Sequence, residues 1–205
     1  MYDTFLKKSE RILTVLLTFS LVPMLFIAIY ARPFVDDYGY STRTHDAWQA
    51  THSVIALVGA IGKEVVDAYY TWQGSFSAIA LFSLQPGIFS EKVYGLSTFI
   101  LVAMFLLGTY LFITAVFGEK SSVTTIVFAS LSIMLMQTLP HAIQGFYWWN
   151  GSSYYTLFYS LMLIQWGMLL KRKKFIFPCI LGFIIGGGNF VTGLLNLEVN
   201  VLMAV

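Results

Sequence analysis

Two adjacent carboxylates, Asp36 and Asp37, are the residues of this sequence best placed to do chemistry. They follow the first long apolar run and stand between Pro33 and the aromatic residues Tyr38 and Tyr40. Neighbouring acids repel each other and add nothing to packing at a membrane surface. One interpretation is a solvated loop. The other, which we favour, is a catalytic or ligand-binding site, because a carboxylate within hydrogen-bond reach of a hydroxyl group can act as its general base.

The composition identifies an integral membrane protein. Of the 205 residues, 58% are hydrophobic and 11% are charged, whereas about a quarter of the residues in a soluble domain are charged. The single cysteine, Cys179, lies in an apolar run and excludes a disulfide framework. The first apolar run lacks a small-residue cleavage site before Pro33, so it does not resemble a signal peptide. We expect membrane lipid around the chain and no nucleic-acid partner.

Uncharged apolar stretches predict an all-α polytopic protein with about six transmembrane helices. About 20 apolar residues are needed to cross a hydrocarbon core of ~30 Å. The predicted spans are 12–31, 93–117, 123–139, 154–170, 175–185 and 190–205. Residues 1–205 then form a single transmembrane domain, and 93–205 holds every span after the first. Because the last stretch is short and lacks a polar flank, we expect the chain to be the N-terminal part of a longer protein.

Basic residues determine the predicted orientation. Three of them lie within residues 7–11, ahead of the first span, and four are consecutive at 171–174. Under the positive-inside rule, both groups lie in the cytoplasm together with the N-terminus. Asp36 and Asp37 then lie on the outer face of the membrane, where the first span ends.

Residues 32–92 form the predicted first outer loop, which contains two amphipathic helices. The first is expected over 44–61 and is broken at Gly62, and the second is expected over 63–84. Neither contains an uncharged run of about 20 residues, so both are predicted to lie at the outer interface. The alternative is a short span over 69–84, which would reverse the sidedness of every later segment.

A carboxylate in the last predicted span suggests another site. Glu198 lies in an apolar stretch, where an ionisable group costs about 3 kcal/mol or more unless it faces a polar cavity or partner. Asn196 and Asn200 are four residues apart and share one helix face, and Glu198 is roughly opposite them. A functional acid and a helix–helix hydrogen bond are both compatible with this pattern.

Three motifs in order resemble the GT-C superfamily of membrane glycosyltransferases, which use polyprenyl-phosphate sugars. They are Phe34–Tyr40 with the acidic pair, Tyr70–Phe76 with Trp-Gln-Gly, and Phe146–Tyr155. The last is similar to the tryptophan-containing loop of the bacterial O-antigen-glucosylating and uncharacterised branches. The resemblance covers essentially the whole chain through short motifs. Two departures are Ser75, where relatives often carry arginine, and a chain much shorter than that of family members.

The resemblance implies that Asp36 takes the proton of the acceptor hydroxyl group. Asp37 would be its partner and would hold a hydroxyl group or a divalent cation. In an extended segment adjacent side chains point in opposite directions, so the two acids need not act on one atom. Acids that face one cavity would instead raise one pKa. The three histidines lack the spacing of a zinc site, so no metal-binding residues are predicted.

The leaving phosphate needs a cation, and the sugar needs a binding surface. Arg43 is the preferred cation on the outer side because arginine can make bidentate contacts with phosphate. The other expected substrate-binding residues are Tyr38, Tyr70, Trp72, Trp148, Asn150 and Asn189. An aromatic belt at the membrane interface explains the tryptophans and tyrosines equally well. An ordinary turn between helices is the alternative at Asn189.

The predicted function is transfer of a sugar from a polyprenyl-phosphate donor to a glycan or lipid acceptor of the cell envelope. The expected location is a bacterial inner membrane, with the reaction on its outer face. One alternative is a transporter or flippase-like protein with Glu198 as the coupling acid. Another is a truncated remnant without catalytic activity.

Overall fold

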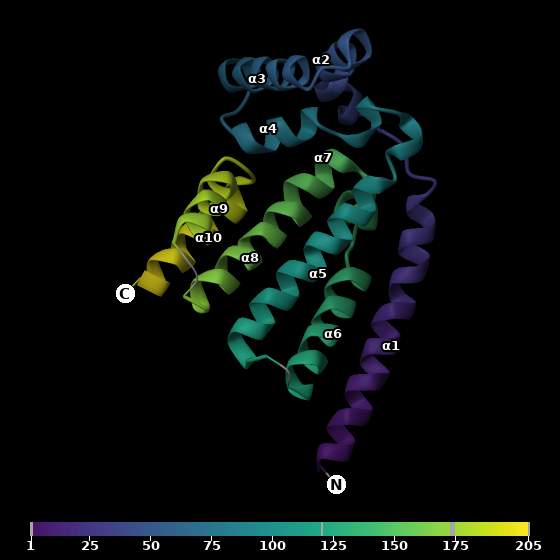
Figure 1. Ribbon diagram of the computed structural model, residues 1–205, viewed down its shortest axis with the longest axis vertical. Helices are drawn as coiled ribbons and strands as arrows, with labels where there is room; N and C mark the ends of the chain where they lie inside the picture. Colours follow the sequence, from purple (N-terminus) through teal and green to yellow (C-terminus); the bar gives the residue numbers. More distant parts are fainter. Residues whose placement is uncertain (1, 120, 173–174, 205) are drawn as a thin grey trace.

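Helices account for all the regular structure of the described residues. The computed structural model describes residues 2–119, 121–172 and 175–204, and these contain no β-strand. Long helices run alongside one another, and other helices lie across one end of this bundle (Figure 1). The all-α prediction is therefore confirmed.

The bundle brings glycines to its closest helix contact. It contains α1 (Tyr2–Ala28), α5 (Leu96–Phe117), α6 (Ser122–Gln137) and α8 (Phe158–Leu170). α5 packs along α8, and α1 packs along α6. A Cβ atom on Gly108 would lie 2.6 Å from the carbonyl oxygen of Ser160, and one on Gly167 would lie 2.9 Å from that of Leu111. Small residues allow helix backbones to approach this closely, so these glycines determine how tightly α5 and α8 meet.

Three helices cap the end of the bundle: α2 (Asp36–Thr51), α3 (Val54–Thr71) and α4 (Phe76–Ser83). The prediction of two helices, over 44–61 and 63–84 with a break at Gly62, is wrong about these boundaries. The chain turns at His52, which has a left-handed φ of 46°, and the Ser53 side chain caps the start of α3. Gly62 lies inside α3 with open space around it, so nothing ends the helix there.

The aromatic segment Phe146–Asn150, expected to be a loop from its similarity to the tryptophan-containing loop, is helical except at Trp148, where the chain bends. It belongs to a π-helix, Ile143–Tyr147, followed by α7 (Trp149–Ser152) and a second π-helix, Ser153–Leu157, which continues into α8. Phe146 and Trp149 are buried in the core rather than exposed on a loop. π-Helical turns are rare and are found frequently at functional sites.

A helical hairpin of α9 (Ile176–Gly186) and α10 (Phe190–Ala204) lies beside α8 (Figure 1). Hydrogen bonds attach this hairpin to the cap. The backbone N–H of Ser77 donates to the carbonyl of Gly187 at 2.8 Å, and the Ser77 hydroxyl donates to the carbonyl of Ile184 at 2.7 Å. The start of α4 is thereby fixed against the turn between α9 and α10.

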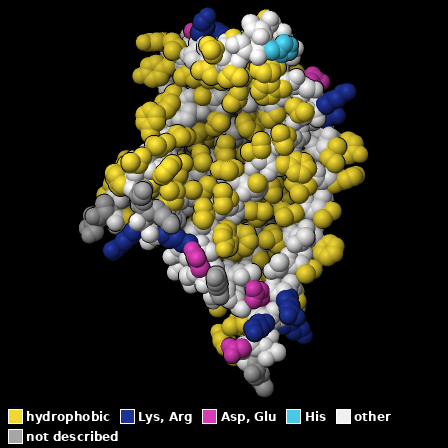
Figure 2. All heavy atoms as spheres, in the orientation of Figure 1, with side chains coloured by type: hydrophobic (Ala, Val, Ile, Leu, Met, Phe, Trp, Pro, Cys, Tyr) yellow, Lys and Arg dark blue, Asp and Glu magenta, His cyan; other side chains and the backbone are white. Residues whose placement is uncertain are grey.

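Two helical segments, Tyr2–Ala28 and Glu91–Phe117, are long and apolar enough to cross a membrane. Four shorter apolar helices have 10–17 residues: Phe76–Ile88, Ser122–Gln137, Ile176–Gly186 and Phe190–Met203. Among the described residues, helix length and composition therefore identify two candidate spans, and the predicted number of about six is not confirmed. Figure 2 shows one face of the molecule, where hydrophobic side chains cover the middle and most charged side chains lie toward the ends.

Candidate active site

The carboxylate of Asp37 is fully buried where the cap meets the bundle. Its Oδ2 atom accepts hydrogen bonds from the backbone N–H of Phe34 at 3.1 Å and from the hydroxyl of Tyr94. Its Oδ1 atom accepts one from the backbone N–H of Asn150 at 3.1 Å. Tyr94 in turn accepts a hydrogen bond from the N–H of Trp149 at 2.8 Å. Asp37 therefore joins the end of the first helix, the start of α5 and α7.

Opposing effects act on the ionisation of Asp37. Burial raises the pKa of its carboxyl group above the usual value of 3.8, whereas the hydrogen bonds from Tyr94, Phe34 and Asn150 lower it. The neighbouring charge of Asp36 raises the pKa further, and the net direction is upward. All three protein contacts are donors to the carboxylate, so they leave little room for an additional ligand on this side chain.

Asp36 is exposed, and its carboxylate makes no hydrogen bond or ion pair with the residues that the structure describes. It begins α2, where the positive end of the helix dipole favours a negative charge. The expectation of an extended acidic segment is wrong, because both acids lie in the first turn of this helix. The two carboxylates nevertheless have separate environments, one open to solvent and one enclosed by protein donors.

Backbone strain marks the residue immediately before the pair. Val35 has a φ of 44°, in the left-handed region that a β-branched residue rarely adopts. Such strain persists only where surrounding contacts hold it, and it is found preferentially at functional sites. The hydrogen bond from Phe34 to Asp37 is one of the contacts that hold this turn.

A cavity of about 510 Å³ adjoins the acidic turn. Its walls come from the turn itself and from the segment before α7: Phe34, Val35, Pro140, His141, Ala142, Ile143, Gln144 and Trp148. The indole N–H of Trp148 donates to the carbonyl of Phe34 at 3.2 Å. The third sequence motif is thus brought to the first, as expected for parts of one site.

Asn150 contributes its backbone to Asp37, but its side-chain amide is unsatisfied. The residue is 4% exposed, and neither its Oδ1 nor its Nδ2 has a hydrogen-bond partner among the described residues. A buried polar group left without a partner costs about 1–3 kcal/mol. The Asn150 amide is therefore free to contact a polar atom of a ligand, and its predicted role in substrate binding stays a prediction.

The guanidinium of Arg43 is already paired with carboxylates of α3. It lies 3.4 Å from Glu64 Oε2 and 2.6 Å from Asp67 Oδ2. The hydrogen bond that Arg43 donates to Asp67, together with the negative charges of Asp67 and Glu64, raises the pKa of Arg43. Because Glu64 and Asp67 occupy the guanidinium N–H groups, Arg43 holds α2 against α3. A phosphate that bound Arg43 as predicted would have to displace these two carboxylates.

The predicted aromatic residues fall into two groups. Tyr38, Tyr70 and Trp72 are exposed on the cap, whereas Trp148 lines the cavity beside the acidic turn. Trp72 also contacts Tyr40, with ring centroids 5.8 Å apart. This contact brings the second motif to α2, one turn after the acidic pair.

Tyr40 and Tyr94 are site residues that the sequence predictions omitted. Burial, followed by the charges of Asp36 and Glu64, raises the pKa of Tyr40 to about 12, so its hydroxyl stays protonated near Asp36. Tyr94 is completely buried at the start of α5. The position of Tyr94 next to an apolar run gave no sign of a polar role. Tyr40 could have been identified, because it belongs to the first motif.

Asn189 acts as a helix cap. Its buried Oδ1 atom accepts hydrogen bonds from the N–H groups of Val191 at 3.0 Å and Thr192 at 3.1 Å. This is the ordinary way to satisfy the first N–H groups of a helix. The side-chain oxygen of Asn189 is therefore already used as an acceptor, and an ordinary turn between helices accounts for its contacts.

The acidic pair does not provide a built site for a divalent cation. Within the described residues there is no group of three or more His, Cys, Asp or Glu side chains that could hold a metal ion. Both oxygens of Asp37 accept hydrogen bonds from protein groups. Of the two acids only the Asp36 carboxylate remains available, so a magnesium ion here would need phosphate oxygens of a substrate and water as further ligands.

In α10 the two faces differ as expected. Asn196 is buried and accepts a hydrogen bond at 2.9 Å from the indole N–H of Trp166 in α8. Glu198 is exposed on the other side of the helix. The helix–helix hydrogen bond is thus made by Asn196, and Glu198 takes no part in it.

Comparisons with protein-family models, with curated proteins and with solved structures find no match to this chain. The chemistry of the site must therefore be inferred from its own residues and their arrangement.

Proposed function

We propose that this chain is an integral membrane glycosyltransferase that moves a sugar from a polyprenyl-phosphate donor to a glycan or lipid acceptor of the cell envelope. The reaction takes place on the outer face of a bacterial inner membrane, with six spans and a cytoplasmic N-terminus. The observation that carries the proposal is the exposed, unpaired Asp36, which is held in place by its buried neighbour Asp37.

Asp36 acts as the general base. Its carboxylate accepts the proton of the acceptor hydroxyl, and the oxygen of that hydroxyl forms a bond with the anomeric carbon of the donor sugar. The bond between this carbon and the phosphate oxygen breaks, and its electron pair leaves with the polyprenyl phosphate. Because the acceptor attacks opposite to the leaving group, the configuration of the sugar is inverted.

Asp37 acts as a positioning residue rather than as a second ligand-binding acid. Its three hydrogen bonds fix the turn from which α2 starts, and therefore fix the place of Asp36. A base must be held within hydrogen-bond distance of the proton that it removes. The strained φ of Val35 is maintained by the same contacts.

The cavity beside the acidic turn receives the donor. Its apolar walls suit an isoprenoid chain, and Trp148 offers a flat ring for the sugar. Since Arg43 is paired with Glu64 and Asp67, it is not the first choice for contact with phosphate. His141 lines the cavity and replaces Arg43 as the candidate to donate a hydrogen bond to the phosphate.

The test compares two acids on one helix. In membrane vesicles supplied with radiolabelled polyprenyl-phosphate sugars, Asp36→Asn should lower transfer by at least about 100-fold, the usual contribution of a general base. Asp46→Asn is the matched control, because Asp46 is also an exposed acid of α2. Unchanged transfer in Asp36→Asn, with transfer detectable in the unmodified chain, would overturn the assignment.

A transporter remains the second candidate because Glu198 is an exposed carboxylate on an otherwise uncharged helix. For this function Glu198→Gln should abolish proton-coupled uptake, and Asp36→Asn should leave it intact. The two proposals therefore place the essential acid at opposite ends of the sequence.

A further inference from the structure

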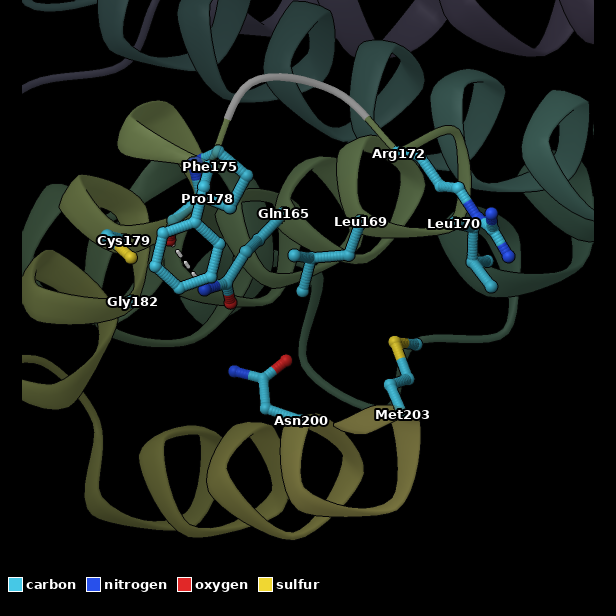
Figure 3. Close-up of a pocket in the computed structure, with 10 residues that line it drawn as sticks. All are labelled: Gln165, Leu169, Leu170, Arg172, Phe175, Pro178, Cys179, Gly182, Asn200 and Met203. Carbon is cyan, nitrogen blue, oxygen red and sulfur yellow. Dashed lines mark hydrogen bonds between the residues drawn. The ribbon is translucent and has the colours of Figure 1, made fainter. Parts of the chain in front are cut away.

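A second cavity, of about 780 Å³, lies among α8, α9 and α10 (Figure 3). Most of its lining is apolar, with Leu169, Leu170, Phe175, Pro178 and Met203 on its walls. The polar groups are the amides of Gln165 and Asn200 and the guanidinium of Arg172. The cavity thus combines a surface for hydrocarbon with a few placed polar atoms, as ligand sites commonly do.

Gln165 presents an unused acceptor to this cavity. Only 3% of the residue is exposed, and its Nε2 donates a hydrogen bond to the carbonyl of Pro178 at 2.7 Å. This bond determines which end of the amide faces the cavity, because the reversed amide would set two oxygens against each other. The Oε1 atom is buried and has no partner among the described residues.

Asn200 supplies another acceptor from the opposite helix. Its Oδ1 atom is also buried without a partner in the described part of the chain. The amides of Asn200 and Gln165 point toward one another across the cavity (Figure 3). Two buried oxygens that lack donors indicate a ligand with hydroxyl groups, since a hydroxyl can donate a hydrogen bond to each.

Arg172 contributes a positive charge that the described residues leave free. Its side chain makes no hydrogen bond or ion pair with them, whereas the preceding Lys171 is bound to Glu119 at 2.7 Å and to Thr114 at 3.1 Å. Arg172 also has a left-handed φ of 50°. Its guanidinium suits bidentate contact with a phosphate, and the sequence continues with two further lysines.

We propose that this cavity binds phosphatidylglycerol from the adjacent membrane leaflet. The phosphate lies at Arg172, the headgroup hydroxyls donate to Gln165 and Asn200, and an acyl chain lies along Phe175 and Met203. This lipid combines the anion, the hydroxyl donors and the hydrocarbon that the lining requires. The site is separate from the acidic turn and does not depend on the proposed transferase activity.

Cys179 provides the readout, because it lines the cavity, is exposed and is the single cysteine of the chain. The delipidated protein is purified in detergent, and the rate of its modification by N-ethylmaleimide is measured. Phosphatidylglycerol should slow modification at least tenfold. Phosphatidylmethanol has the anion without the hydroxyls, and phosphatidylcholine has neither a net negative charge nor hydroxyls, so each should slow it less than threefold.

Variants link the protection to the proposed contacts. Arg172→Ala and Asn200→Leu should each abolish at least three-quarters of the protection, whereas Lys92→Ala, at an exposed lysine outside the cavity, should retain it. Native mass spectrometry of the same variants should show the matching loss of bound lipid. Circular dichroism and thermal unfolding identify any variant that has lost its fold, and the other substitution then decides.

Three results would overturn the proposal. Equal protection by all three lipids would show that any amphiphile covers the cavity. Protection that survives in both Arg172→Ala and Asn200→Leu would exclude the assigned contacts. Slow modification that depends on protein concentration and not on lipid would instead identify a second copy of the chain as the occupant.

Discussion

The acidic turn at the start of α2 and the amide pair between α8 and α10 both place oxygen atoms in apolar surroundings. The oxygens of Asp37 accept three hydrogen bonds from the protein itself. Those of Gln165 and Asn200 that face the cavity accept none from the described residues. A satisfied buried group stabilises one conformation, whereas an unsatisfied one gains free energy only when a ligand supplies the donor. The acidic turn is therefore suited to hold Asp36 in place, and the amide pair is suited to bind a ligand.

Removing the satisfied carboxylate should have the largest effect. Asp37→Ala leaves the donors on Phe34, Tyr94 and Asn150 without a partner, so we expect the free energy of unfolding to fall by about 3 kcal/mol or more. Denaturant unfolding in detergent measures it. Asp36→Ala is the matched control and should change stability by less than about 0.5 kcal/mol. An equal fall in the free energy of unfolding in the two variants would contradict the assignment of Asp37 as the positioning residue and Asp36 as the general base.

A smaller loss is expected when only one donor is removed. Tyr94→Phe keeps the ring but removes the hydroxyl that donates to Asp37 and accepts from Trp149. The free energy of unfolding should fall by about 1–3 kcal/mol. In a double-mutant cycle with Asp37→Asn, the two changes should be non-additive, because the residues are in direct contact. If the two changes in the free energy of unfolding simply added, Tyr94 and Asp37 would not belong to one hydrogen-bond network.

Removing an amide that lacks a partner should not lower the free energy of unfolding. In delipidated protein, Asn200→Leu replaces an amide oxygen that has no partner by an apolar side chain of similar size. We expect stability to be unchanged or to rise by up to about 1 kcal/mol. Added phosphatidylglycerol should raise the melting temperature of the unmodified chain more than that of the variant. A large destabilisation of the lipid-free variant would show that Asn200 already has a structural partner.

The smallest effect concerns pH. Since the pKa of Asp37 is raised above 3.8 in the folded chain, the folded state binds more protons than the unfolded state between the two pKa values. The stabilisation that comes from protonated Asp37 is complete below about pH 4, and it is lost as the pH rises through the pKa of Asp37 in the folded chain. In denaturant unfolding at a series of pH values, Asp37→Asn should remove this dependence of the free energy of unfolding on pH. A slope of the same size in the variant would assign it to another group.

Sequence patterns located the main parts of this arrangement because they reflect local chemistry. The apolar runs predicted the long helices, and the acidic pair and Trp148 were identified as parts of one site that the fold does bring together. The break at His52 could not be predicted in the same way. Glycine has a low helix propensity, but the exposed Gly62 is tolerated in α3, and a left-handed turn forms ten residues earlier.

Contacts between distant segments were beyond the reach of local patterns. Tyr94 and Asp37 are 57 residues apart in the sequence, and nothing around Tyr94 distinguishes it from an interfacial tyrosine. Arg43 was expected to be free for phosphate, yet α3 returns alongside α2 and supplies two carboxylates to it. The availability of a charged group is a property of the packed structure, so residue type alone overestimates it.

The close contact of α5 with α8 has a consequence for biosynthesis. Gly108 meets the backbone of Ser160, and Gly167 meets that of Leu111. The ribosome makes about 60 residues between the two glycines, which takes roughly 3 to 12 seconds at ordinary elongation rates. During that interval α5 has been synthesised, but the helix that packs against it has not. The surface of α5 at Gly108 therefore stays uncovered by α8 until that helix has been made.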